Sequence, residues 1–198
     1  MIKNLIELTK VRIGFLVLMT TVIGFYLGSN GDIIYDLLIF TVAGTLMSST
    51  GASVLNNVFE VDNDSKMDRT KHRVLPTKKI SKTFALFLGI FLIISGLITL
   101  YFKVNLLTTI LSFVTITLYL FIYTPLKQIS WLNTSVGAIP GAIPPLGGWT
   151  AATNQLELGG IALFLILFFW QHPHFYSIAF IHKDDYEKGG YKMLPSVD

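Results

Sequence analysis

Six apolar blocks, each long enough to cross a bilayer, set the strongest limit on how this chain folds. The blocks cover roughly residues 12–29, 34–57, 84–102, 104–123, 132–151 and 158–181. A helix that crosses the hydrocarbon core needs about 20 mostly apolar residues. Charged residues make up only 14% of the chain and hydrophobic ones 52%, which leaves too little polar surface for a soluble domain. The sequence therefore predicts an all-α fold, a polytopic membrane helix bundle whose single domain spans residues 1–198 in a lipid bilayer.

The basic residues predict how the bundle is oriented. When the six spans are threaded with the N-terminus inside, every one of the fifteen Lys and Arg residues except Lys103 falls on the same side. Cytoplasmic loops carry such an excess of positive charge. We therefore expect a multi-pass protein of the cell inner (plasma) membrane, with the N-terminus, the 62–82 segment and the C-terminus in the cytoplasm. The net charge of +3 then reflects topology, and nucleic acid is not expected as a partner.

The fifth block has an unusual composition for a membrane helix. Residues 137–149 contain three prolines and four glycines. Proline removes a backbone hydrogen bond, and the freed carbonyl must be covered by protein or by a polar cavity. This composition predicts a broken helix. Two interpretations are open: the break forms a cavity wall, or the prolines only shape how the helices pack.

The second block ends in a run of acidic and amide side chains. If the helix continues, Asn56, Glu60, Asp64 and Asp68 lie four residues apart on one face. Mg²⁺ typically takes one or two carboxylates together with phosphate oxygens. Basic side chains suited to phosphate follow directly, namely Arg69, Lys71 and Arg73. The segment thus predicts a diphosphate site, and the alternative is a solvated loop whose charges only cap the helix.

A second acidic segment, residues 183–187, follows the sixth block on the same side of the membrane. Two carboxylate sets on one side are what a shared diphosphate site requires. Just before it, residues 170–176 place two imidazoles, an amide and aromatic rings inside a membrane helix, where polar groups usually face a cavity or the bundle interior. For His172 and His174, hydrogen bonds to neighbouring helices are the alternative.

Several stretches together resemble one known family. They are Glu7-Leu8-Thr9-Lys10 with Arg12-Ile13; Asn56-Asn57 with Glu60, Asp62, Asp64, Met67, Arg69-Thr70 and Arg73; Tyr123-Thr124 with Leu126-Lys127 and Asn133; Gly137 with Gly141-Ala142-Ile143-Pro144-Pro145 and Gly147-Gly148-Trp149; and Trp170-Gln171, Pro173-His174-Phe175, Asp185-Tyr186, Gly190 and Met193-Leu194-Pro195. The set is similar to the UbiA prenyltransferase superfamily, in the form found in haem O synthases. The resemblance covers nearly the whole chain.

This resemblance implies a function and a site. It implies a prenyltransferase domain that transfers the farnesyl group of farnesyl diphosphate to the vinyl group of protohaem IX (haem B), giving haem O and diphosphate. Mg²⁺ is the implied cofactor, haem B and farnesyl diphosphate are the implied substrates, and a haem-modifying enzyme or a terminal oxidase assembly is the implied partner. The implied catalytic and metal-binding residues are Asn56, Glu60, Asp64 and Asp185. The implied substrate-binding residues are Asp62, Arg69, Lys71, Arg73, Lys127, Trp170, His174 and Tyr186.

The chain departs from the family pattern in two respects. Position 60 is Glu where the family motif usually has Asp, which moves the carboxylate outward by one methylene. Family members also normally continue through further C-terminal spans, which this chain is expected to lack. Two alternatives to a haem acceptor are a UbiA-type enzyme with an aromatic or chlorophyll-type acceptor and a small membrane transporter. A transporter should hold its acids near mid-membrane, whereas these lie at the cytoplasmic helix ends.

Overall fold

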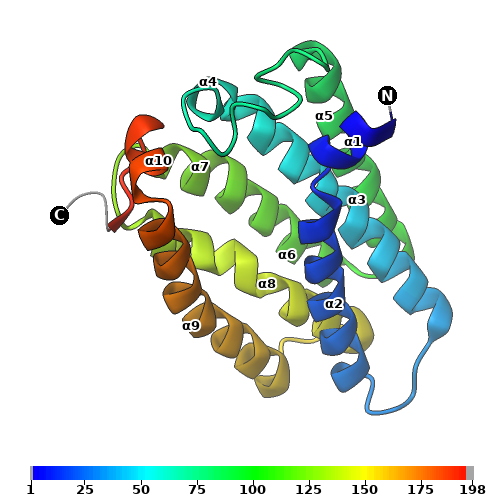
Figure 1. The fold of residues 1–198 in the computed structure, drawn as a ribbon. Coiled ribbons are helices and arrows are strands. Elements are labelled where there is room, and N and C mark those ends of the chain that lie inside the picture. The colour runs from blue at the N-terminus through cyan, green and yellow to red at the C-terminus, as the bar shows by residue number, and fades with distance from the viewer. Residues whose placement is uncertain (1, 195–198) are drawn as a thin grey trace.

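A computed structural model describes residues 2–194, and these fold into a helical bundle (Figure 1). Long helices occupy the positions of the six apolar blocks: α2 (Val11–Gly28), α3 (Tyr35–Phe59), α5 (Lys82–Lys103), α6 (Leu106–Thr117), α8 (Asn133–Thr153) and α9 (Leu158–Ile181). A π-helical turn, η1 (Leu118–Tyr123), and the short α7 (Thr124–Leu126) continue α6. Three further short helices are α1 (Ile2–Leu8), α4 (Val61–Asp64) and α10 (Lys183–Lys188). Pro195, the last residue of the family-like stretches, lies outside the described residues.

Within residues 2–194, five helical segments are long and apolar enough to cross a membrane: α2, α3, α5, the α6–α7 run and α9. No strand occurs in this part of the chain. The prediction of an all-helical membrane bundle is therefore confirmed. The fifth block forms the helix α8, which is not among these five and which packs against α2, α6 and α9.

Helix α8 corrects the prediction of a broken fifth span. It runs without interruption from Asn133 to Thr153 and holds Pro140, Pro144 and Pro145 inside it. Each proline deprives a carbonyl one turn earlier of its usual donor. Packing on several sides maintains the helix, and the side chain of Gln171 on α9 donates to the Ala138 carbonyl at 3.3 Å. Tertiary contacts therefore override the local tendency of the prolines to break the helix.

Glycines let α2 and α8 approach almost to backbone contact. A Cβ atom on Gly24 would lie 1.9 Å from the carbonyl oxygen of Pro145, and one on Gly148 would lie 1.9 Å from that of Thr21. The α3–α5 contact is similar, since a Cβ on Gly51 would lie 2.7 Å from the Gly89 carbonyl oxygen. Small residues commonly allow such close approach in membrane bundles. The close contacts within the α2–α8 and α3–α5 pairs therefore fix the distance between the two helices of each pair.

The charged segments gather at one end of the bundle, the end at which α1, α4 and α10 lie (Figure 1). Helix α3 ends at Phe59, and Glu60 leaves helical geometry with φ −96° and ψ 4°. The predicted continuous stripe from Asn56 to Asp68 is therefore wrong. After the short α4 the chain turns away, so Asp68 lies on the surface, where its carboxylate pairs with Lys71 and Lys188.

Candidate active site

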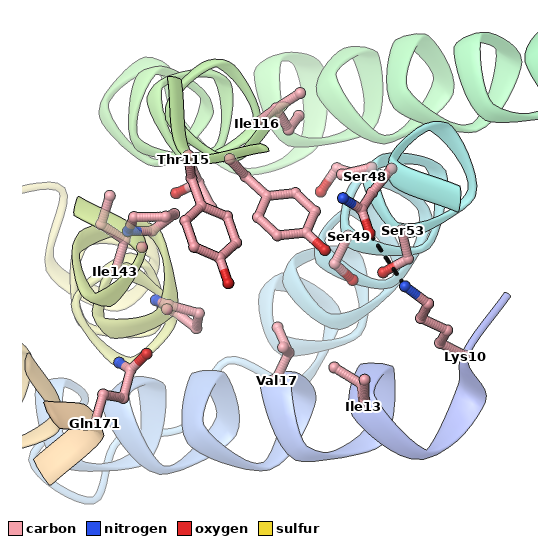
Figure 2. A pocket seen from close by; sticks show the side chains of 18 of the residues that line it. Lys10, Ile13, Val17, Ser48, Ser49, Ser53, Thr115, Ile116, Ile143 and Gln171 are labelled. Carbon is pink, nitrogen blue, oxygen red and sulfur yellow. Dashed lines mark hydrogen bonds between the residues drawn. The ribbon is translucent and has the colours of Figure 1, made fainter. Parts of the chain in front are cut away.

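A cavity of about 430 Å³ opens among α2, α3, α6, η1, α8 and α9. Figure 2 shows side chains from several of these helices around the same space, among them Val17, Ser49, Ile143 and Gln171. One end of the cavity lies among the charged segments and the other reaches into the helical bundle. The two ends differ in chemistry.

The charged end carries an excess of cations. Four basic side chains line it, namely Lys10, Arg69, Arg73 and Lys127, together with the carboxylates of Glu60 and Asp64. Four positive charges against two negative ones leave a net attraction for an anion. A diphosphate group, which carries several negative charges on adjacent oxygens, matches this excess.

Both carboxylates are buried and paired. Lys127 Nζ lies 2.7 Å from Glu60 Oε1, and Arg73 Nη1 lies 2.8 Å from Asp64 Oδ2. Burial by itself would raise the pKa of Glu60, but the charge and hydrogen bond of Lys127 outweigh it and hold that pKa below its ordinary value. Glu60 is therefore ionised at neutral pH, as a group that binds a cation must be.

Asn56 lies beside these carboxylates on the last turn of α3 and is 1% exposed. Its side-chain oxygen accepts a hydrogen bond of 3.2 Å from Lys10 Nζ, the dashed line in Figure 2. Lys10 joins α1 to α2 in left-handed geometry with φ 49°. Burial lowers the pKa of Lys10 to about 8, and the nearby charge of Arg73 adds to this effect. An anion in the cavity would favour the charged form of Lys10.

The deeper part of the cavity is apolar, with hydroxyl groups along one wall. Ile13, Ile116 and Ile143 contribute aliphatic surface, and Ser48 Oγ bonds to the Thr45 carbonyl of its own helix. The rings of Tyr119 and Tyr123 stack with centroids 5.7 Å apart near the charged end. Hydroxyls that are satisfied within their helices leave such a wall compatible with an isoprenoid chain.

Several residues that the sequence assigned to the site do line this cavity. They are Asn56, Glu60, Asp64, Arg69, Arg73, Lys127 and Tyr186. Gly141, Pro144 and Gly147 of α8 and Phe175 of α9 also line it, as expected for a wall built from these helices. The structure thus brings seven of the assigned residues from four segments into one space.

Other assigned residues lie elsewhere. Asp62 and Lys71 are exposed and do not line the cavity. Trp170 is 58% exposed and stacks on His174 at 4.8 Å, outside the cavity wall on α9. His172 instead bonds to Ser135 Oγ on α8 at 3.1 Å, which matches the alternative of a hydrogen bond between helices.

Asp185 holds the loop that carries Arg69. Its two carboxylate oxygens accept the backbone N–H groups of Asp68 and Arg69 at 3.0 and 2.9 Å. The Arg69 bond is the main reason why the pKa of Asp185 is lowered. Asp185 does not line the cavity in this structure, and its role as a metal ligand stays a prediction. The expected contact between the second and sixth spans is made by the segments that follow them, since Asn63 Nδ2 donates to the Gly189 carbonyl at 2.7 Å.

Near the charged end, the cavity is also lined by four side chains that have no role assigned from the sequence: Lys10, Tyr119, Tyr123 and Tyr191. Lys10 and Tyr123 stand in stretches that resemble the family, but nothing in those stretches marked them as cavity residues. Tyr119 and Tyr123 are four residues apart, a spacing that places both on one helix face. That spacing was the available signal, but it does not reveal which face meets a cavity.

The charged end suits a Mg²⁺ ion that arrives with a phosphate. Asn56, Glu60 and Asp64 present an amide oxygen and two carboxylates, each of which has a cationic partner. Within residues 2–194, no three His, Asp or Glu side chains converge into a metal cage. Mg²⁺ commonly uses few protein ligands and completes its shell with water and phosphate. The donor set therefore fits a metal shared with a bound diphosphate.

Comparisons with known proteins agree with this geometry. The model of the UbiA prenyltransferase family matches residues 17–198. A Protoheme IX farnesyltransferase of Solibacter usitatus is 43% identical over 99% of this chain and 70% of its own length. A mitochondrial Protoheme IX farnesyltransferase of Arabidopsis thaliana is 44% identical over 97% of this chain and 45% of its own length. The chain thus spans roughly half to two thirds of the curated relatives that it matches.

The fold also has a counterpart among solved structures. A structure described in connection with digeranylgeranylglyceryl phosphate synthase in membranes superposes with a TM-score of 0.79 over 100% of this chain and 69% of its own. The two sequences are 18% identical, so this match concerns the fold alone. Because the family model matches most of the chain and close relatives match its full length, the chain belongs to the UbiA prenyltransferase family, among the protoheme IX farnesyltransferases.

Proposed function

We propose that this protein transfers the farnesyl group of farnesyl diphosphate to a vinyl group of protohaem IX, giving haem O. The bond between farnesyl C1 and the diphosphate oxygen breaks, and C1 bonds to the terminal vinyl carbon. Water adds to the neighbouring carbon and loses a proton, while diphosphate leaves. The product carries a hydroxyethylfarnesyl group.

The observation that carries this proposal is the two-part cavity. A diphosphate fits the net positive end formed by Lys10, Arg69, Arg73 and Lys127, and a farnesyl chain fits the apolar part that α2, α3, α6 and α8 surround. The names of the relatives reported above supply the proposed acceptor, protohaem IX.

Charge neutralisation by the protein would promote departure of the diphosphate. The guanidinium groups of Arg69 and Arg73 are suited to phosphate oxygens because they donate several hydrogen bonds in one plane. A bound Mg²⁺, held by Asn56, Glu60 and Asp64, would withdraw electron density from the leaving group. Both effects stabilise negative charge that develops as the C–O bond breaks.

The cavity also protects the cation that remains. An allylic carbocation reacts with water, so the helices must exclude bulk solvent from it. The stacked rings of Tyr119 and Tyr123 lie at the border between the charged and apolar parts. Aromatic faces attract cations within about 6 Å. We assign these two rings to stabilisation of the farnesyl cation.

We further propose the cellular setting. Because the basic segments gather at one end, the diphosphate end faces the cytoplasm from the plasma membrane. Farnesyl diphosphate and haem B are the proposed substrates, and an enzyme that modifies or uses haem O is the proposed partner class. We propose that residues 1–198 form a single prenyltransferase domain.

Membranes that contain the full chain test the function. Haem B, farnesyl diphosphate and Mg²⁺ are added, and haem O is measured by chromatography and mass spectrometry. We expect haem O only when all three are present, and none after chelation of the metal. A panel of aromatic and chlorophyll-type acceptors serves as the comparison, and faster transfer to one of these would reassign the acceptor.

A further inference from the structure

Thr124 connects the π-helical turn to the side chain of Asn56. The Thr124 hydroxyl donates to the Tyr119 carbonyl at 2.8 Å, and Asn56 Nδ2 lies 3.0 Å from the same hydroxyl oxygen. Both side chains are buried, at 6% and 1% exposed. The contact therefore lies at the charged end of the cavity but is shielded from solvent.

The number of donors and acceptors fixes the orientation of the Asn56 amide. A carbonyl oxygen only accepts, so the single hydroxyl proton of Thr124 is used at Tyr119. Toward Asn56 the hydroxyl can then only accept, which requires the amide nitrogen to face it. The amide oxygen consequently points to the other side.

Lys10 imposes the same orientation independently. Its ammonium group has only donors, and it lies 3.2 Å from Asn56 Oδ1. A flipped amide would place its N–H₂ group against the ammonium, donor against donor, and its oxygen against a hydroxyl whose single proton is already engaged. Thr124 and Lys10, on opposite sides of Asn56, thus favour the same orientation of its side-chain amide, in which the oxygen points toward the cavity.

The π-helix is what places the Thr124 hydroxyl at Tyr119. In η1 the Thr124 N–H bonds to the carbonyl five residues earlier instead of four, and the side chain donates to the same oxygen. Pro125 follows, and its ring would clash with the carbonyl one turn earlier in a regular helix. The wider turn relieves this clash, and such turns often occur at functional sites.

We propose that Thr124 is a positioning residue that keeps the Asn56 oxygen directed at the metal–diphosphate end of the cavity. The proposal rests on the proposed function, because Asn56 is there a ligand for Mg²⁺. Thr124 does not line the cavity and acts only through Asn56. Groups that orient a metal ligand typically change metal affinity about 10- to 100-fold when they are removed.

Binding of Mn²⁺ by the purified full chain tests this without turnover. Free Mn²⁺ is measured by electron paramagnetic resonance in the presence of farnesyl thiodiphosphate, an analogue that ionises very slowly. Thr124→Val preserves the shape of the side chain and removes its oxygen, so Mn²⁺ affinity should fall about 10- to 100-fold. Thr124→Ser restores the oxygen and should bind Mn²⁺ like the wild type.

Thr41→Val is the matched control, because Thr41 is fully buried and bonds only to the Leu37 carbonyl of its own helix. It should bind Mn²⁺ normally. Normal binding by Thr124→Val would overturn the proposal. So would equal losses in Thr124→Val and Thr124→Ser, or in Thr124→Val and Thr41→Val, because shape or general packing would then be responsible.

A second measurement separates this proposal from the proposed function. In protein labelled with ¹⁵N-asparagine, the Asn56 side-chain amide signal is identified by its loss in Asn56→Ala. Thr124→Val should shift this signal, while Thr124→Ser should not. If the wild type bound no analogue, the proposed function would fail, and an unshifted signal in Thr124→Val would separately refute the orienting bond.

Discussion

Asp64 illustrates how one residue can be buried, charged and accessible to a ligand. It is 2% exposed, yet it lines the cavity and pairs with Arg73. An ionised group in such a place requires a partner of opposite charge. In the proposed reaction a metal and a phosphate provide further partners, so that Asp64 would share Arg73 with the substrate.

We predict that Asp64→Ala lowers the rate of haem O formation about 100-fold or more, because a ligand that stabilises the leaving group is lost. Single-turnover kinetics on membranes, with the amount of inserted protein measured in parallel, provide the test. Asp36→Ala is the control, since Asp36 is an exposed carboxylate in the first turn of α3, outside the cavity wall. Unchanged turnover by Asp64→Ala would show that its carboxylate takes no part in the reaction.

The Glu60–Lys127 pair allows stability and activity to be separated. Lys127→Met leaves a buried carboxylate without its partner, which should destabilise the fold by about 3 kcal/mol. The double variant Glu60→Gln/Lys127→Met removes both charges, so most of the thermal stability should return. Activity should not return, because both groups also belong to the proposed diphosphate site. Thermal unfolding in detergent and the haem O assay give the two readouts.

This prediction fails if the double variant unfolds at as low a temperature as Lys127→Met. The pair would then contribute through packing instead of charge. It also fails if the double variant regains activity, since the two charges would then have only a structural role.

At the scale of elements, the α2–α8 contact sets one side of the cavity. Gly147 and Gly148 are adjacent on α8 but face different surroundings. A Cβ on Gly148 would meet the Thr21 carbonyl, whereas a Cβ on Gly147 would have no neighbour within 4 Å. Because the obstacle at Gly148 is backbone, a side chain there forces the two helices apart.

We predict that Gly148→Ala destabilises the bundle by about 2 kcal/mol through overpacking. The unfolding temperature in detergent should fall by about 5 °C, as expected for a chain of this length. Gly147→Ala is the matched control and should unfold close to the wild-type temperature. Equal losses in the two variants would mean that helix propensity or flexibility, and not contact with α2, explains the glycines.

The whole molecule concentrates charge at one end. The short helices α1, α4 and α10 lie at that end, while the turns after α2 and α8 lie at the opposite end (Figure 1). In the proposed orientation, the same basic residues that place this end in the cytoplasm would also attract a diphosphate from there.

The absence of cysteine makes this topology directly testable. Single cysteines are introduced at exposed positions by Ser65→Cys, Asp32→Cys and Gln155→Cys. A membrane-impermeant maleimide should label Ser65→Cys only in inside-out vesicles, and the other two only in right-side-out vesicles. Labelling of Ser65→Cys from the outer side would invert the orientation and exclude a cytoplasmic diphosphate site.

The sequence by itself determined the membrane class and the positions of the long helices. These properties follow from local composition and from spacing within a single segment, which can be read without knowing what lies opposite. Bilayer thickness fixes the length of a span, and helix periodicity fixes which neighbours share a face.

Only the tertiary structure decided whether α8 stays continuous, where α3 ends and which distant side chains meet. Neighbouring helices stabilise α8 despite its prolines. The chain leaves the helical geometry of α3 at Glu60, whose side chain forms an ion pair with Lys127. Lys10 and the two stacked tyrosines reach the cavity because of how α2 and η1 pack. The Asp185 carboxylate instead accepts a hydrogen bond from the backbone of the loop at Asp68. Such choices depend on contacts between segments far apart in sequence, whose energies no local pattern contains.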